Sequence, residues 1–157
     1  MARRRRAQRR MVAPDTKYNS ELVAHFINHV MARGKKSTAQ GIVYDALDEV
    51  KTKISSSEPL EVLVKAIDNV KPKVEVKSRR VGGVTYQVPI EVDSARQLGL
   101  ALRWLIQFSA TRKGVPMRKA LALEIIDAFN EQGNAIKKRD EVHKMAQANK
   151  AFAHYRW

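Results

Sequence analysis

Apolar residues recur at spacings of three and four in three successive segments between residues 20 and 72. This spacing places the apolar residues of each segment on one face of a helix. Ser20 is a typical N-cap for the first helix, which Gly34 would end, and Pro59 suits the first turn of the third. The three faces are Leu22, Val23, Phe26, Ile27 and Val30; Ala39, Ile42, Val43, Ala46, Leu47, Val50 and Ile54; and Leu60, Leu63, Val64, Ile67 and Val70.

Between residues 73 and 92 the apolar period changes from 3.6 to 2, which predicts a β-hairpin. Its turn is expected over residues 79–83, where Gly82 and Gly83 can adopt the positive φ of a tight reversal. An isolated two-stranded ribbon is marginally stable in water. We therefore expect an arm that packs on helices at its base and carries Arg79 and Arg80 at its tip.

The pattern becomes helical again after residue 93. Residues 94–110 are apolar on most of their circumference, which predicts the central helix of the domain, with Arg96, Arg103 and Gln107 in one outward stripe. A fifth helix is predicted from Pro116 to Gln132, with Gly133 as its stop, and a charged sixth from Asn134 to about Asn149. The fold class is therefore mainly α, a six-helix domain with a protruding two-stranded hairpin.

The length of 157 residues favours one domain. We divide it into a flexible basic arm at 1–19, a helical domain at 20–149 with the hairpin inserted at about 73–92, and a C-terminal tail at 150–157 that combines aromatic and basic residues. A chain of this length can bury its own core, so we expect a monomer.

Positive charge dominates the composition, with 30 lysines and arginines against 16 acids and a formal net charge of +14. A folded domain tolerates such self-repulsion poorly without a polyanionic partner, and nucleic acid is the expected one because phosphate contacts release counterions. The first ten residues alone hold Arg3, Arg4, Arg5, Arg6, Arg9 and Arg10.

The remaining cations gather at the predicted element junctions and on the last helix. Arg112, Lys113 and Gly114 precede a helix N-terminus, where free backbone N–H groups favour a phosphate. The tail, with His154, Tyr155, Arg156 and Trp157, has a composition suited to stacking on bases. The other clusters are Arg33, Lys35 and Lys36; Arg79 and Arg80; Arg118 and Lys119; and Lys137, Lys138, Arg139 and Lys144.

Other function classes find little support. There is no cysteine, which excludes disulfides and a thiol nucleophile and suits a reducing cytosol. The best apolar run, residues 98–108, is short and carries Arg103 and Gln107, so no membrane span is expected. The arginine-rich start lacks the apolar stretch of a secretory signal, and a transit peptide would be longer and richer in serine.

The histidines offer only weak candidates for chemistry. His25 and His29 have the spacing of two metal ligands on one helix face, but no glutamate follows His25 and no third ligand is evident. His143 beside Asp140 and Glu141 could be drawn as the general base of a ribonuclease, a combination that is common by chance on a charged helix. We expect no metal, no cofactor and no enzymatic activity.

Three stretches resemble the bacterial form of small-subunit ribosomal protein seven. They are SELVAHFINHVMARGKKSTAQGIVYDAL at 20–47, VEVKSRRVGGVTYQVPIEV at 74–92 and NKAFAHYRW at 149–157. With the arginine-rich start, the resemblance covers essentially the whole chain. It implies a six-helix domain with a β-ribbon that binds the 3′ major domain of small-subunit ribosomal RNA and acts early in assembly of the subunit head, in the cytoplasmic ribosome.

The resemblance also implies which residues would touch RNA. Its ribosomal RNA surface would include the arm from Arg3 to Arg10, the loop with Arg33, Lys35 and Lys36, the ribbon with Lys73 and Lys77, and the basic positions of the last three helices. The ribbon tip and C-terminal helix would lie near exit-site transfer RNA and messenger RNA, beside a neighbouring small-subunit protein. Those positions are Arg79, Arg80, Val81, Gly82, Gly83, Tyr86, Lys144 and the tail.

An architectural DNA-binding protein is the alternative, because small basic helical domains with a β-arm also bind the minor groove. The arm of this chain carries Pro89, but its tip reads Arg-Arg-Val-Gly-Gly rather than an apolar or prolyl wedge.

Overall fold

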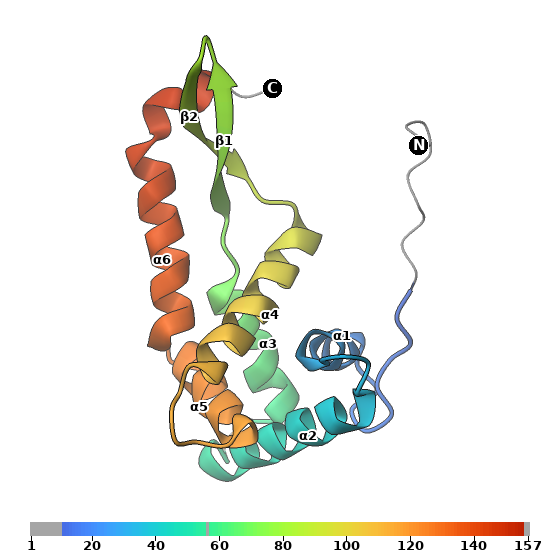
Figure 1. Ribbon diagram of the computed structural model, residues 1–157. Helices are drawn as coiled ribbons and strands as arrows, with labels where there is room; N and C mark the ends of the chain where they lie inside the picture. Colours follow the sequence, from blue (N-terminus) through green and yellow to red (C-terminus); the bar gives the residue numbers. More distant parts are fainter. Residues whose placement is uncertain (1–10, 56, 156–157) are drawn as a thin grey trace.

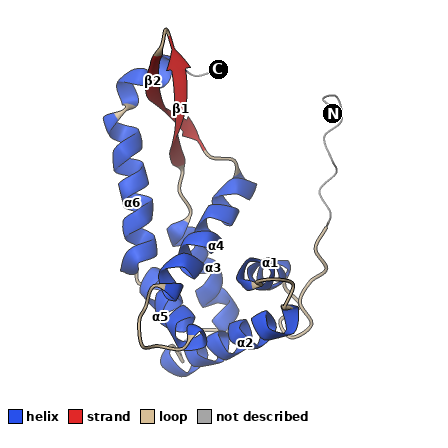
Figure 2. Ribbon diagram, viewed as in Figure 1, coloured by secondary structure: helices blue, strands red, loops and turns tan. Residues whose placement is uncertain are grey.

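The computed structural model describes residues 11–55 and 57–155. In this part of the chain a helical body carries one antiparallel ribbon that projects from it (Figures 1 and 2), which confirms the predicted fold class. The elements are α1 (Glu21–Val30), α2 (Lys36–Lys53), α3 (Pro59–Val70), β1 (Val74–Val81), β2 (Val84–Glu91), α4 (Ser94–Ala110), α5 (Met117–Phe129), α6 (Gly133–Ala148) and the 3-10 helix η1 (Lys150–Tyr155). The predictions for residues 1–10, Arg156 and Trp157 lie outside the described residues.

The core lies where α5 crosses its neighbours. α5 contacts α2, α3, α4 and α6, and its residues Leu121 and Ile125 are fully buried. α4, which the sequence predicted as the central helix, contacts α1, α3, α5 and α6, so the two helices share the centre. Burying a leucine or isoleucine side chain contributes about 1.5–3 kcal/mol, so this crossing holds the body together.

Two helices end earlier than predicted. α1 ends at Val30 instead of Gly34, because Met31 is extended and both Arg33 and Gly34 have positive φ, 53° and 76°. α5 ends at Phe129 instead of Gln132, and Glu131 has φ 57°. Gly133, at φ 90°, begins α6 rather than ending α5. A Cβ at Gly133 would lie 3.0 Å from the Asp127 Cβ atom, so the residue needs both the conformation and the space of glycine.

Part of the segment assigned to the flexible arm is fixed to α2. The buried Asp15 carboxylate accepts hydrogen bonds from the Tyr44 hydroxyl at 2.6 Å and from the backbone N–H groups of Lys17 and Tyr18. Burial alone would raise the pKa of Asp15, but these hydrogen bonds outweigh it and lower the pKa. Lys17 adds an ion pair with Asp48 at 3.0 Å. The helical body therefore includes the chain from Asp15 onward.

The ribbon spans Val74–Glu91, close to the predicted 73–92, but its turn is tighter than the sequence predicted. Arg79 pairs with Tyr86 and Arg80 with Thr85, so both arginines belong to β1 and only Gly82 and Gly83 form the turn. Their φ values of 57° and 89° match the type I′ geometry that suits the twist of a hairpin. The five-residue turn predicted at 79–83 is therefore wrong, although both arginines remain close to the tip.

Candidate nucleic-acid interface

Most of the cations expected to bind RNA lie on the surface without a carboxylate partner. Within residues 11–55 and 57–155, ten of them are exposed and make no ion pair. They are Arg33, Lys35, Lys36, Lys73, Arg80, Arg103, Lys113, Lys119, Lys137 and Lys144. Such a surface attracts a polyanion strongly, because each phosphate contact releases counterions.

Two helices begin with cations where acids would be favourable. α2 has Lys35 as its N-cap and Lys36 as its first residue, with no acid in its first turn. The first turn of α5 carries Arg118 and Lys119 and likewise no acid. The positive end of the helix dipole repels these cations, whereas a phosphate there would meet free N–H groups and side-chain charges together. Both helix starts are therefore suited to a phosphate chain.

The outer face of α4 forms a shallow basic hollow. Ala95, Arg96, Gly99, Leu100 and Arg103 line a space of about 350 Å³. The position of a Cβ on Gly99 is open, with no atom within 4 Å. The stripe of Arg96 and Arg103 predicted from the sequence is thus confirmed as exposed, and small residues between the arginines let a sugar-phosphate backbone approach the helix closely.

Several expected cations have carboxylate partners. Arg96 donates to the nearly buried Glu75 carboxylate from Nε at 2.9 Å and from Nη2 at 2.8 Å, and Lys77 lies 3.6 Å from the same group. Arg118 pairs with Asp45 at 3.2 Å, and Lys138 pairs with Glu141 at 3.3 Å. The pairs of Arg118 and Lys138 are exposed, and exposed pairs contribute about 0–1 kcal/mol, so a phosphate can compete for these two cations.

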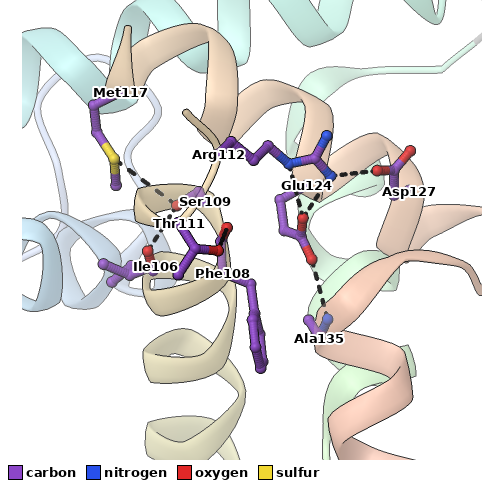
Figure 3. A network of polar contacts seen from close by, with 9 residues as sticks. All are labelled: Ile106, Phe108, Ser109, Thr111, Arg112, Met117, Glu124, Asp127 and Ala135. Atoms are coloured by element: carbon purple, nitrogen blue, oxygen red, sulfur yellow. Dashed lines mark hydrogen bonds and ion pairs between the residues drawn. The ribbon is translucent and has the colours of Figure 1, made fainter. Parts of the chain in front are cut away.

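Arg112 points inward. Its guanidinium contacts Glu124 at 2.6 Å and Asp127 at 2.5 Å, and Glu124 also accepts the Ala135 N–H at 3.0 Å (Figure 3). Burial alone would lower the pKa of Arg112, but the two carboxylates raise it, so the guanidinium stays charged. The network joins the α4–α5 loop, α5 and the start of α6, which gives Arg112 a structural role.

Arg139 and Arg79 are also engaged within the protein. Arg139 donates to the carbonyl oxygen of Asn69 at 2.5 Å and pairs with Asp140 at 2.7 Å. Arg79 donates to the carbonyl oxygen of Tyr155. Both side chains thereby stabilise contacts between distant segments, a role that the sequence did not indicate.

His143 has a structural partner. Its Nε2 atom accepts the Lys73 backbone N–H at 3.0 Å, which joins α6 to the base of the ribbon. Burial, followed by the positive charge of Arg139, lowers the pKa of His143, and the opposing effect of Asp140 is smaller. The two carboxylates considered with His143 as a ribonuclease site are engaged in ion pairs, Asp140 with Arg139 and Glu141 with Lys138.

The described residues also bear on metal binding and membranes. The Nδ1 atom of His29 lies 2.9 Å from the carbonyl oxygen of His25, so that ring contacts the backbone of its own helix. No group of three or more histidine, aspartate or glutamate side chains in the described part of the chain is arranged to hold a metal ion. None of the helices described is long and apolar enough to cross a bilayer.

Of the residues expected near transfer RNA and messenger RNA, those that the structure describes gather at one end of the molecule. The ribbon and the C-terminal η1 lie side by side there (Figure 1), with Gly82 and Gly83 exposed and Val81 half-buried. The ring centroids of Tyr86 and Tyr155 are 5.0 Å apart, and those of His154 and Tyr155 are 4.0 Å apart with the ring planes tilted by 43°. Lys144 is exposed on α6. Sequence reasoning placed these residues near one ligand, but it missed their contacts with one another.

Comparison with known proteins gives one consistent result. A family model described as ribosomal protein S7p/S5e matches residues 2–150. The chain is 57% identical to small ribosomal subunit protein uS7 of Akkermansia muciniphila and 57% identical to that of Sorangium cellulosum, over 157 residues and the full length of both chains in each case. It is 59% identical to uS7 of Dictyoglomus turgidum, again over the full length of both chains.

A match over nearly the whole chain favours the ribosomal interpretation over the architectural DNA-binding one, and it agrees with the basic surface described above. The chain belongs to the ribosomal protein S7p/S5e family and is a protein of the small ribosomal subunit.

Proposed function

We propose that this chain binds the 3′ major domain of small-subunit ribosomal RNA through its exposed cations and, by doing so, initiates assembly of the subunit head. The observation that carries the proposal is the set of ten exposed cations without ion pairs in the described residues, together with the basic starts of α2 and α5. Membership of a ribosomal protein family supports ribosomal RNA, rather than DNA, as the polyanion that this surface binds.

The mechanism is binding without turnover. Phosphate contacts from the α1–α2 loop, the α4 hollow and α6 would set the position of the body on the RNA. Specificity would come from the shape of the folded RNA and from unpaired bases, because side chains cannot read the narrow major groove of an RNA duplex. Arg33 in the α1–α2 loop, Arg103 on α4 and Lys113 in the α4–α5 loop are the residues that we expect to contact phosphate first. Each is exposed and makes no ion pair within the described residues.

The ribbon tip would have a second role, near exit-site transfer RNA and messenger RNA. The exposure of Arg80 supports this role. The neighbouring turn consists of two glycines, whose lack of side chains lets a nucleic acid backbone approach closely. Neighbouring small-subunit proteins would contact the same end.

A loop variant tests the main surface. Arg33→Ala, Lys35→Ala and Lys36→Ala together should reduce the magnitude of the salt slope for the ribosomal RNA domain by about two to three units, at roughly 0.7–0.9 per lost phosphate contact. Lys51→Ala and Lys53→Ala, at the other end of α2, provide the control and should leave the slope unchanged. An unchanged slope in the loop variant would remove this loop from the RNA surface.

Arg80→Ala tests the tip separately. It should spare binding to the ribosomal RNA domain and weaken retention of exit-site transfer RNA by reconstituted subunits. Arg80 is chosen without Arg79 because Arg79 binds the Tyr155 carbonyl within the protein. The opposite pattern would contradict the assignment of the tip.

A further inference from the structure

The C-terminal η1 packs against the outer half of the ribbon. The ring of Tyr86 on β2 lies 5.2 Å from Phe152 and 5.0 Å from Tyr155, between centroids. On the neighbouring strand, the Arg79 guanidinium donates to the carbonyl oxygen of Tyr155. Because Arg79 and Tyr86 are directly paired across the ribbon, η1 holds both strands at one level.

The ribbon is attached to the body at a second, separate place. At its base the Lys73 N–H donates to His143, and the nearly buried Glu75 binds Arg96. A hollow of about 460 Å³ lies beside this base, lined by Val74, Pro89, Ile90 and Glu91 of the ribbon and by His143, Ala146, Gln147, Lys150 and Ala153 of α6 and η1. Val88, in the middle of the ribbon, is buried, and η1 contacts β2 in the outer half beyond it.

We infer that Phe152 and Tyr155 form a clamp that sets the direction of the ribbon tip. An isolated two-stranded ribbon is marginally stable in water, so the outer half needs an external contact. Each aromatic pair at such a separation favours the form in which η1 is packed against the ribbon by about two- to thirteenfold. The sequence suggested that the Tyr155 ring stacks on RNA bases, whereas in this structure Phe152 and Tyr155 both act as positioning residues for the ribbon.

The clamp concerns the free protein, and only its consequence for transfer RNA rests on the proposed function of the tip. Tyr86→Ala removes both ring contacts from the ribbon side, and Phe152→Ala with Tyr155→Ala removes them from the other side. Both variants should raise the hydrogen exchange rate of the ribbon amides by at least about fivefold. This is the product of the factors of slightly more than about two that two weak aromatic pairs contribute. Agreement between the two variants separates the clamp from any effect of alanine on strand stability.

The direction of the tip can be measured with spin labels, because the natural chain contains no cysteine. Thr85→Cys places a label on the face of β2 opposite Tyr86, and Lys51→Cys places another on the exposed side of α2. The distance distribution between the labels should be narrow in the labelled parent chain and broad once the clamp is removed. Tyr86→Phe and Tyr155→Phe keep the rings, so their distributions should stay narrow. The control Met145→Ala, at an exposed position of α6 that does not line the hollow, should also leave the distribution narrow.

A distribution that stays narrow in both clamp variants, with ribbon exchange rates changed by less than twofold, would overturn the inference. Subunits reconstituted with the Phe152→Ala, Tyr155→Ala chain are then tested for transfer RNA retention. A broadened distribution with lowered retention supports both the clamp and the role of the tip. A broadened distribution with unchanged retention supports the clamp and contradicts the role of the tip.

Discussion

Replacing Arg112 by methionine should destabilise the protein strongly while leaving its RNA affinity nearly intact. Glu124 is 0% exposed, and Arg112 is the partner that neutralises its charge. Removing one member of a buried pair costs about 3–5 kcal/mol, and we take about 3 kcal/mol because the Arg112 side chain is itself 26% exposed. For a chain of this size, that corresponds to a fall in Tm of about 6–12 °C.

The assay is thermal unfolding followed by circular dichroism, with urea unfolding as a second measure. Arg112→Met combined with Glu124→Gln should recover part of the loss, because no unpaired charge then stays buried and the amide oxygen can still accept the Ala135 N–H. Arg103→Met, at an exposed cation without an ion pair, should change stability by less than about 0.5 kcal/mol. An unchanged Tm in Arg112→Met, together with a lower salt slope of RNA binding, would contradict the structural role of Arg112.

Three further variants probe other parts of the structure. Gly133→Ala should destabilise the protein by about 1–3 kcal/mol, because residue 133 has φ 90° and a crowded Cβ position. Gly41→Ala is the control, since the Cβ position of Gly41 on α2 is open, and it should stabilise the protein by about 0.5–1 kcal/mol. Urea unfolding measures both changes. His143 has a lowered folded pKa, so its contribution to stability is complete above its ordinary pKa of about 6.5 and is lost as the pH falls through the folded pKa. His143→Gln should therefore flatten the stability difference between pH 7.5 and 5, and an identical pH dependence in the variant would show that the Lys73 contact is not sensitive to protonation. Deleting residues 1–10 should reduce the magnitude of the RNA salt slope by about four to five units, one phosphate contact for each of the six arginines, and an unaltered slope would exclude the arm from the interface.

The helices and the ribbon could be predicted because each follows a local rule. Pro59 and Ser20 stand at the predicted helix starts, and the change of period at Val74 locates β1. The helix ends were less accurate, because Arg33 and Glu131 adopt positive φ and no local signal identifies a non-glycine residue in that conformation. The glycines Gly34, Gly82, Gly83 and Gly133 located each turn approximately, but they did not identify the residue at which the preceding helix or strand ends.

The candidate surface could be predicted only in part, for a different physical reason. Net charge and clustering identify a basic protein, but they do not show which cations a fold turns inward. Arg112 meets Glu124, twelve positions away, and Arg79 meets Tyr155, 76 positions away, so both contacts depend on tertiary packing. Tyr86 likewise meets Phe152 only because α6 returns the chain to the ribbon.

The full chain should be titrated with a transcript of the 3′ major domain of small-subunit ribosomal RNA and with duplex DNA of equal length, each across a series of salt concentrations. We predict a preference for the RNA of about a thousandfold or more that persists at physiological salt, as specific recognition requires. Equal affinities for the two nucleic acids that collapse together as salt rises would contradict specific ribosomal RNA binding and would favour an architectural DNA-binding role.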